Sequence, residues 1–364
     1  MIYLDNAATT KPDSHIMEAY LKLYREMFYN SESLHAGGLD ARHLLEQTRN
    51  YMQNYFDSRK HVIFSRSGSH ANEIAIQLLL KGSSAGQILV SPYEHPSIDA
   101  ALEPFRENYD IVRMPLEYDG NIDLISLSKM FETDTSLVIM QHVNSEIGYR
   151  LPVEAVGEMC SISDIPFHVD GVQGAHKDAI DIDEVCSSYS FSGHKLHGTK
   201  GTGVLMVDYK YMNVLNRHFH HESGTQNGTL NVPGIAVMAM CLSADPNMRK
   251  MNETKEYLGK ELRNIGVTPL QFDVSAPHII ACVTPSVEGQ YVMQSLSSKN
   301  IYISTGTACG QGRMVSEGLA ALLDRKYETS EEHYIRISIS KNTTLDEIDV
   351  LISHLNLILQ EVKR

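Results

Sequence analysis

The fold of this chain is decided around Ser190-Phe191-Ser192-Gly193-His194-Lys195-Leu196-His197-Gly198. The stretch directly follows an apolar, strand-like run and precedes a second one, Val204–Val207. A lysine in such a tight turn is held away from bulk water, and desolvation lowers the pKa of an amine. Lys195 is therefore a candidate for Schiff-base chemistry. The alternative is a surface lysine in a polar loop, and this stretch alone does not decide between the two.

The chain before this turn predicts parallel βαβ units. Short apolar runs alternate with helical segments, and the expected strands cover residues 61–65, 87–91, 111–114, 136–141 and 167–170. Strands separated by helices of this length form an α/β sheet that is covered on both faces. The segment 30–40 is rich in Ser, His and Gly, so we expect a loop there, before a helix over residues 41–56.

The pattern changes after residue 232, where helices over 235–242 and 249–265 indicate a domain junction. A smaller α/β module follows. A chain of 364 residues suits one large and one smaller domain. We expect residues 13–245 to form the large, cofactor-binding domain, and residues 1–12 together with 246–364 to form the small one.

Composition narrows the class of protein. Hydrophobic residues at 42% and charged residues at 21% are ordinary globular values. The net charge of -14 provides no electrostatic footprint for direct nucleic-acid binding, although it is compatible with a basic protein partner.

No window approaches the apolar length that spans a bilayer, and the N-terminus lacks the pattern of a signal peptide. Five cysteines are scattered without the spacing of metal ligands: Cys160, Cys186, Cys241, Cys282 and Cys309. We therefore expect a cytoplasmic protein with reduced thiols and no metal site. Four of these cysteines have apolar or helical surroundings, whereas Cys309 lies in a polar, glycine-rich loop.

Polar clusters follow several of the expected strands, where ligands bind in open α/β sheets. Ser67-Gly68-Ser69-His70-Ala71-Asn72 could cradle a phosphate at a helix start, or could be an ordinary helix cap. His95, just beyond another strand, could stack on a flat ligand or could merely be solvated. Asp170 ends a buried apolar strand and needs a partner there. The pyridinium of a pyridoxal cofactor is one such partner, and helix capping is the alternative.

In these residues and in the motifs that follow, the chain resembles the cysteine desulfurases of the aminotransferase class V group. These are pyridoxal-phosphate enzymes of fold type I, with a mainly parallel seven-stranded sheet and a smaller C-terminal α/β domain. The matching motifs occur in family order over nearly the full length: residues 3–10, 33–35, 94–95, 144–148, 168–173, 190–195, 228–229, 304–309 and Arg336. The most specific of them are Ser192-Gly193-His194-Lys195 and Gly306-Thr307-Ala308-Cys309.

The resemblance implies a role for each residue near the cofactor ring. Lys195 would bind pyridoxal 5'-phosphate as a Schiff base and later shuttle protons. Asp170 would pair with the pyridine nitrogen, and His95 would stack on the ring and assist proton transfer. Gln173 would donate a hydrogen bond to the phenolic oxygen, and Asn144 would contact both cofactor and substrate.

The phosphate would be held by Gly68, Ser69, Ser192 and His194. Thr229 would reach the phosphate of a neighbouring subunit, which implies a homodimer with sites at the interface.

Arg336 would bind the carboxylate of L-cysteine, as guanidinium geometry favours. Cys309 would be the nucleophile that takes up the sulfur as a persulfide. Gly306, Gly310 and Gly312 would make its loop mobile, and Arg313 could favour the thiolate.

The chain departs from the family pattern at three places. Ser145 stands where a second asparagine is usual, Ser69-His70 where Thr-Glu is usual, and Gln226 where an arginine is usual. These changes suggest a specialised paralogue, in which some cofactor contacts are lost or made through water.

The sequence therefore predicts a cysteine desulfurase that converts L-cysteine to L-alanine and passes sulfur to an acceptor protein. An iron–sulfur scaffold and a tRNA-thiolating enzyme are both compatible acceptors, and the departures favour the second. The alternatives are a selenocysteine lyase, another class V lyase or transaminase, and a sulfur-relay paralogue without turnover.

Overall fold

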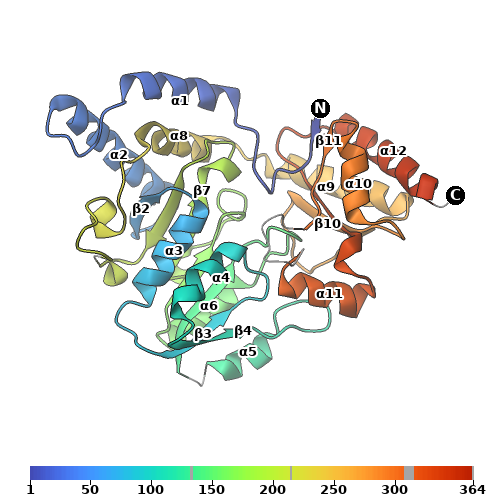
Figure 1. Ribbon diagram of the computed structural model, residues 1–364, viewed down its shortest axis with the longest axis horizontal. Helices are drawn as coiled ribbons and strands as arrows, with labels where there is room; N and C mark the ends of the chain where they lie inside the picture. The colour runs from blue at the N-terminus through green and yellow to red at the C-terminus, as the bar shows by residue number, and fades with distance from the viewer. Residues whose placement is uncertain (132–133, 214, 307–314, 363–364) are drawn as a thin grey trace.

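The structure is a computed structural model that describes residues 1–131, 134–213, 215–306 and 315–362 (Figure 1). Its described residues form a seven-stranded sheet in the order β2-β8-β7-β6-β5-β3-β4. The strands are β2 (His61–Ser65), β3 (Gly86–Val90), β4 (Tyr109–Arg113), β5 (Thr135–Gln141), β6 (Phe167–Asp170), β7 (Ser188–Ser192) and β8 (Gly203–Val207).

This sheet is mainly parallel, as expected. Strands β4, β3, β5, β6 and β7 pair in parallel, whereas β8 runs antiparallel to both β7 and β2. The register places Gln141 beside Asp170 and Asp170 beside Ser190. The carboxyl ends of the central strands therefore meet along one edge, where ligands of α/β proteins bind.

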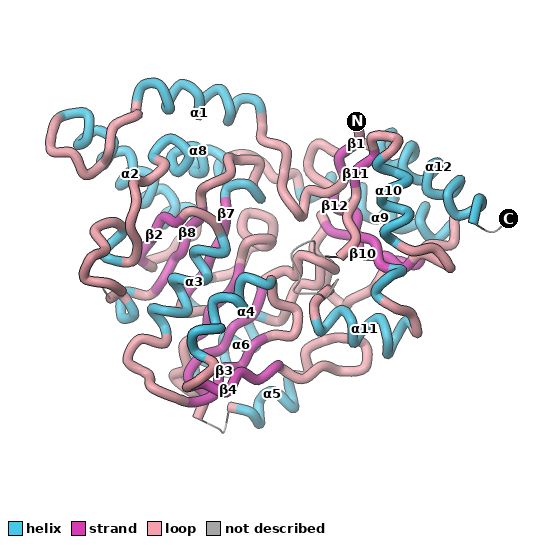
Figure 2. The backbone as a smooth tube through the Cα atoms, in the orientation of Figure 1, coloured by secondary structure: helices cyan, strands magenta, loops and turns pink. Residues whose placement is uncertain are grey.

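Alternate residues of each strand point to opposite faces of the sheet. Val62, Phe64, Val204 and Met206 belong to the core cluster shared with α1 (Ser14–Glu26), α2 (Ala36–Tyr55), α6 (Val153–Ile162) and α8 (Val232–Ser243). Their neighbours Ile63, Leu205 and Val207 pack against α3 (Gly68–Leu79), and Ile88 and Val90 pack against α3 and α4 (Pro96–Leu102). Helices thus cover both faces, which Figure 2 lets the reader follow. The short helices α5 (Leu124–Met130) and α7 (Ile182–Val185) complete this part.

The expected loop over residues 30–40 is wrong at its end, because α2 begins at Ala36. His35 caps the helix, and its ring accepts a hydrogen bond from the Gly38 backbone N–H at 3.3 Å. A Cβ at Gly38 would lie 2.2 Å from the Ser33 carbonyl oxygen. The glycine is therefore needed for close packing and does not break the helix here.

The smaller part follows α8 and lies at the right of Figure 1. It contains a three-stranded antiparallel sheet, β12-β10-β9, and a parallel pair, β1-β11. The elements are β1 (Ile2–Tyr3), α9 (Met248–Asn264), β9 (Thr268–Pro269), β10 (Ile279–Val283), α10 (Gly289–Ser297), β11 (Ile301–Tyr302), α11 (Glu317–Tyr327), β12 (Tyr334–Ser338) and α12 (Leu345–Val362).

This part has its own hydrophobic cluster, which joins Leu4 to residues between Met251 and Leu359. From this packing we propose that residues 1–12 and residues 246–364 together form the small domain. Residues of β12 and α11 also reach the large cluster, among them Tyr334 and Leu319. The two parts therefore pack directly on each other. None of the described helices combines the length and apolar character needed to cross a membrane.

Candidate active site

Lys195 ends a short 3₁₀ turn, Gly193–Lys195, that starts directly after β7. Its Nζ donates hydrogen bonds to the carbonyl oxygens of Ala7 and Ala8, the second at 2.8 Å. The amine therefore lies against the N-terminal loop, between the two parts of the molecule.

Burial and, to a smaller extent, the positive charge of Arg336 lower the pKa of Lys195 to about 8. The carboxylates of Asp5 and Asp170 act in the opposite direction. The lysine is thus the desolvated amine that the tight turn predicts. Near neutral pH a fraction of it is uncharged and able to attack a carbonyl carbon.

Asp170 lies at the end of β6 and is only 4% exposed. Its Oδ2 accepts a hydrogen bond from Asn72 Nδ2 at 2.9 Å, and its Oδ1 accepts one from the Val172 backbone N–H at 3.0 Å. The carboxylate is therefore fixed by two donors that carry no charge. Each oxygen keeps a lone pair for a further donor such as a pyridinium N–H.

His95 is the N-cap of α4, and its Nδ1 accepts a hydrogen bond from the Ser97 backbone N–H at 3.1 Å. Burial lowers the pKa of its imidazole, against the opposing charge of Asp170. The ring is thus held in place by a backbone donor, and its role at a ligand stays a prediction.

Gln173 donates from Nε2 to the Ala7 carbonyl at 2.8 Å, and its Oε1 accepts from His278 Nε2 at 3.1 Å. The Ala7 carbonyl therefore joins Gln173 to Lys195. His278 is fully buried, and its Nδ1 has no hydrogen-bond partner among the described residues.

Two of the predicted phosphate residues lie at the start of α3. Gly68 and the exposed Ser69 form the first turn, while the Ser67 side chain accepts from the His70 backbone N–H at 3.1 Å. A Cβ at Gly68 would lie 2.6 Å from Val172 Cγ2 and 3.5 Å from Ser192 Cβ. The first N–H groups of a helix lack partners within it and favour an anion.

Ser192 and His194 lie on the neighbouring turn. Ser192 Oγ donates to the Thr202 carbonyl at 3.0 Å, and His194 Nδ1 lies 3.2 Å from Thr9 Oγ1. Burial and the charge of Lys195 lower the pKa of His194 to about 4, so its ring is neutral near pH 7.

Gln226, the departure from an arginine, lies away from this group. It is 3% exposed, and its Nε2 donates to the Phe64 carbonyl on edge strand β2. Glu222 accepts from the Phe64 backbone N–H at 2.7 Å. These side chains cover the open edge of the sheet. Thr229 is exposed nearby.

Arg336 comes from β12 and is 6% exposed. Its guanidinium donates to Asp5 Oδ1 at 2.8 Å and to the Ser145 carbonyl at 2.9 Å, and its Nε has no partner among the described residues. Ser145 stands where the family usually has a second asparagine, and its backbone carbonyl thus helps to orient Arg336.

Asn144 uses its amide within the protein. Its Nδ2 donates to the Tyr93 carbonyl at 2.7 Å, and its Oδ1 accepts from the backbone N–H groups of Glu146 and Ile147, both at 2.8 Å. This bonding holds the loop that carries Ser145. The role of Asn144 in contacting cofactor and substrate stays a prediction.

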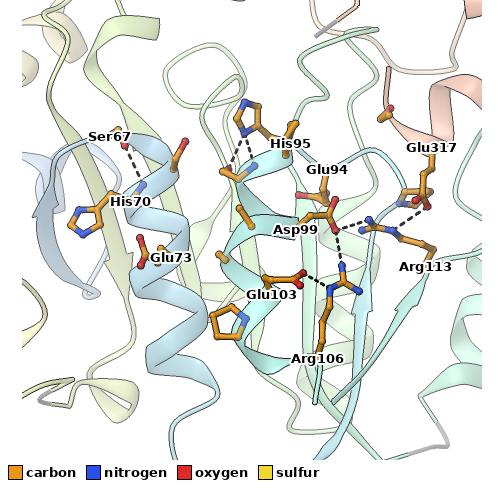
Figure 3. A pocket seen from close by; sticks show the side chains of 18 of the residues that line it. Ser67, His70, Glu73, Glu94, His95, Asp99, Glu103, Arg106, Arg113 and Glu317 are labelled. Carbon is orange, nitrogen blue, oxygen red and sulfur yellow. Dashed lines mark hydrogen bonds and ion pairs between the residues drawn. The ribbon is translucent and has the colours of Figure 1, made fainter. Parts of the chain in front are cut away.

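A groove of about 1320 Å³ opens beside His95 and runs between α3 and α4 (Figure 3). Ser67 and Ser69 line one wall, and Glu94 lies next to His95. Burial, and to a smaller extent the charge of Asp170, raise the pKa of Glu94 well above its usual range. The groove ends at ion pairs that sequence reasoning missed: Arg113 with Asp99 at 2.6 Å and with Glu317 at 3.2 Å.

Cys309 lies outside the described residues, as do Gly310, Gly312 and Arg313. The described ends of its segment both adjoin the site. Ser304 exchanges two backbone hydrogen bonds with Arg336, at 2.7 and 3.1 Å. Ser316 lines the groove and donates from its backbone N–H to the Glu146 carboxylate at 3.0 Å.

Two further residues escaped sequence reasoning. Asn72 was only part of the phosphate cluster, although its side chain donates a hydrogen bond to the Asp170 carboxylate. Lys177 lines a small cavity of about 30 Å³ together with Lys195 and His278, and burial lowers its pKa to about 7. No spacing in the sequence links Asn72 to Asp170, or Lys177 to Lys195 and His278. The other four cysteines, Cys160, Cys186, Cys241 and Cys282, are free and buried, as expected.

A model of the aminotransferase class-V family matches residues 2–351. The chain belongs to the aminotransferase class-V family. Within it, a putative cysteine desulfurase NifS from Bacillus subtilis is 36% identical and covers 100% of this chain and 96% of its own length. A cysteine desulfurase IscS from Pectobacterium carotovorum is 30% identical, covering 96% of this chain and 91% of its own length. The solved structure of a NifS-like protein superposes with a TM-score of 0.89 at 25% identity, over 99% of both chains.

The residues of this class-V site fit pyridoxal phosphate. Lys195 provides an amine of lowered pKa, and Asp170 is a buried acceptor with free lone pairs. Gly68 has no side chain and so leaves space at the start of α3, where a Cβ would collide with Val172. Arg336 Nε is a buried donor without a partner among the described residues, as a site for a substrate carboxylate requires.

Proposed function

We propose that this protein is a pyridoxal-phosphate-dependent cysteine desulfurase, which converts L-cysteine to L-alanine and passes the sulfur through Cys309 to an acceptor. The observation that carries the proposal is a buried lysine whose pKa is lowered to about 8 and whose charge is felt by both Asp170 and Arg336. The Asp170 carboxylate belongs to the large sheet, and the Arg336 guanidinium belongs to the smaller part. The two groups therefore come together only in the folded molecule. The named NifS and IscS relatives support the same activity.

Bound pyridoxal phosphate would supply an electron sink for the bonds of the substrate. In our proposal Lys195 Nζ would hold the group at its aldehyde carbon, and Asp170 would keep a proton on the ring nitrogen. The first turn of α3, with Gly68 and Ser69, would hold the phosphate together with Ser192 and His194. Gln173 would donate a hydrogen bond to the phenolic oxygen.

Arg336 binds the carboxylate of L-cysteine and turns the substrate so that its sulfur faces the segment of Cys309. Lys195 Nζ would take the proton from the substrate Cα and would return it there after the sulfur has left. The Cys309 thiolate would attack the substrate sulfur, so that an S–S bond forms as the Cβ–S bond breaks, and Cβ would take the proton that the substrate thiol gives up. The products would be L-alanine and a persulfide on Cys309, which accounts for all the atoms of one cysteine and one thiolate.

We further propose a homodimer in which Thr229 of one chain reaches the phosphate of the other, which its exposure permits. An iron–sulfur scaffold or a tRNA-thiolating enzyme would take the sulfur, and the cytoplasm would be the compartment of the reaction. These assignments rest on the family resemblance.

The test follows sulfide and alanine after purified protein is mixed with L-cysteine and a reductant, for wild type, Lys195→Ala and Cys309→Ser. Wild type is expected to form both products in equal amounts, and neither variant should release sulfide at the wild-type rate. Sulfide release by Cys309→Ser at the wild-type rate would exclude the persulfide route. Selenocysteine is offered in parallel: turnover of selenocysteine without turnover of cysteine would establish the lyase instead. If the wild-type protein makes no alanine even with acceptor proteins present, it is a relay without turnover.

A further inference from the structure

Asn72 lies on α3 behind Asp170 and is 1% exposed. Its Nδ2 donates two hydrogen bonds, to Asp170 Oδ2 at 2.9 Å and to Ser97 Oγ at 3.2 Å. One side-chain amide therefore contacts both the buried carboxylate and Ser97, which lies two positions after His95 in the first turn of α4.

The other end of this amide fixes its direction. Asn72 Oδ1 accepts from Ser190 Oγ and from His168 Nε2, the second at 3.1 Å. Burial lowers the pKa of His168 to about 3, so its ring is neutral and carries its single proton on Nε2. Its Nδ1 then accepts from Ser188 Oγ at 2.8 Å. An amide turned the other way would set its oxygen against the Asp170 carboxylate oxygen, which can only accept, so the observed orientation is the one that satisfies these partners.

The same reasoning extends to His95. Ser97 Oγ accepts a hydrogen bond from Asn72 Nδ2, so its own hydroxyl proton is free to point to His95 Nδ1, 2.9 Å away. This Nδ1 also accepts from the Ser97 backbone N–H at 3.1 Å. With two donors aimed at Nδ1, the proton of the neutral imidazole resides on Nε2. Figure 3 shows both interactions as dashed lines from the His95 ring to the start of α4.

We propose that Asn72 is a positioning residue that couples the Asp170 carboxylate to the His95 ring, through Ser97, and so sets the direction of both groups toward the cofactor. The inference rests on the proposed function for the roles of Asp170 and His95. It also gives His95 and Lys195 different roles at the site. A ring that already carries a proton on Nε2 offers a hydrogen bond there and does not accept a second proton, so proton transfer at the substrate carbon belongs to Lys195.

The first measurement records the ¹⁵N resonances of the histidine rings in the purified holoprotein, with His95 assigned by the His95→Gln variant. We expect an unprotonated Nδ1 and a protonated Nε2. Asn72→Ala should shift the Nδ1 resonance of His95, although residue 72 does not contact that ring. Ser97→Ala should shift it too, and it remains informative if Asn72→Ala does not fold.

The second measurement is the affinity for pyridoxal phosphate after its removal. Losing a hydrogen bond to a charged group costs about ten- to a hundredfold in binding. Asn72→Ala should weaken binding by about this factor, whereas Ser97→Ala keeps the bond to Asp170 and should change it by less than about threefold. Thr48→Ala is the matched control, because Thr48 is also buried and its hydroxyl donates only within α2, to the Leu44 carbonyl at 2.8 Å.

Three results would overturn the inference: a proton on His95 Nδ1 in the wild-type protein, an unmoved His95 resonance in both variants, or a loss of affinity in Asn72→Ala no greater than in Thr48→Ala. These results are separate from failure of the proposed function. A wild-type protein that made no alanine would end that proposal, and the state of the His95 ring would still decide this one.

Discussion

The two sides of the site differ in how completely their polar groups are bonded. Behind the cofactor position, Asp170, Asn72 and His168 each find their partners within the protein. Toward the groove and the smaller part, Glu94 Oε2, Arg113 Nη1 and Arg336 Nε have no partner among the described residues. Buried polar atoms without partners are costly, so they mark where a ligand completes the site. The comparison teaches that the side holding a permanent group is built rigid, and the side receiving substrate keeps unmet hydrogen-bonding capacity.

The strongest way to break the rigid side is Asp170→Asn, which keeps the shape and removes the charge. Without the carboxylate, the ring nitrogen loses the anion that keeps it protonated. We expect alanine formation to fall by about a hundred- to a thousandfold, the range for loss of a preorganised electrostatic contact. The rate with L-cysteine measures it, with bound cofactor quantified in parallel. A variant as active as wild type would show that Asp170 does not serve the ring nitrogen.

The substrate side is tested by Arg336→Gln. A guanidinium binds a carboxylate through charge-assisted hydrogen bonds, worth about 2–3 kcal/mol, or about 30- to 150-fold in binding. We expect this loss to appear mainly as a raised KM for L-cysteine, with a smaller change in kcat. Arg106→Gln, at an exposed ion pair with Glu103 in the groove, is the control. An unchanged KM in Arg336→Gln would place the substrate carboxylate elsewhere.

The pH dependence of cofactor uptake compares the two sides directly. Only the neutral amine of Lys195 attacks the aldehyde, so uptake by the cofactor-free protein should rise with pH and level off above about 8. Arg336→Gln removes a cation and should raise this midpoint, whereas Asp170→Asn removes an anion and should lower it. Stopped-flow absorbance over a pH series gives the midpoints. Shifts of the same sign in both variants would contradict the electrostatic account.

The smallest effect is steric. In Gly68→Ala the new Cβ would lie 2.6 Å from Val172 Cγ2, so we expect a loss of stability of about 1–3 kcal/mol and weaker phosphate binding. Val172→Ala removes the obstructing methyl groups, and the double variant should regain much of the loss. Thermal unfolding with and without inorganic phosphate measures both effects. Additive losses in the double variant would mean that Val172 is not the obstacle.

Much of this site was predictable from local sequence. Apolar runs in the sequence predict the strands that precede Asp170 and Lys195. The polar residues that follow these runs lie where parallel strands end. The motifs then identify the family. The helical start at Ala36 was not predictable, because two glycines argue against a helix until the close contact with Ser33 is known.

The partners of the predicted residues were also beyond reach of the sequence. Arg336 contacts Asp5, 331 positions away, and His168 contacts Asn72 across 96 positions. Such pairs depend on how the sheet and the smaller part pack, and no periodicity encodes them. The Ala7 and Ala8 carbonyls that hold Lys195 belong to the backbone, whose acceptors are the same at every residue.

The most direct test of the account is to find where the sulfur goes. The holoprotein is mixed with one equivalent of L-cysteine without reductant, digested, and analysed by mass spectrometry alongside an assay for alanine. We predict that the peptide containing Cys309 gains one sulfur atom for each alanine formed, and that Lys195→Ala yields neither product. Alanine formed without sulfur on Cys309, or sulfur on Cys309 in the Lys195→Ala variant, would contradict the account.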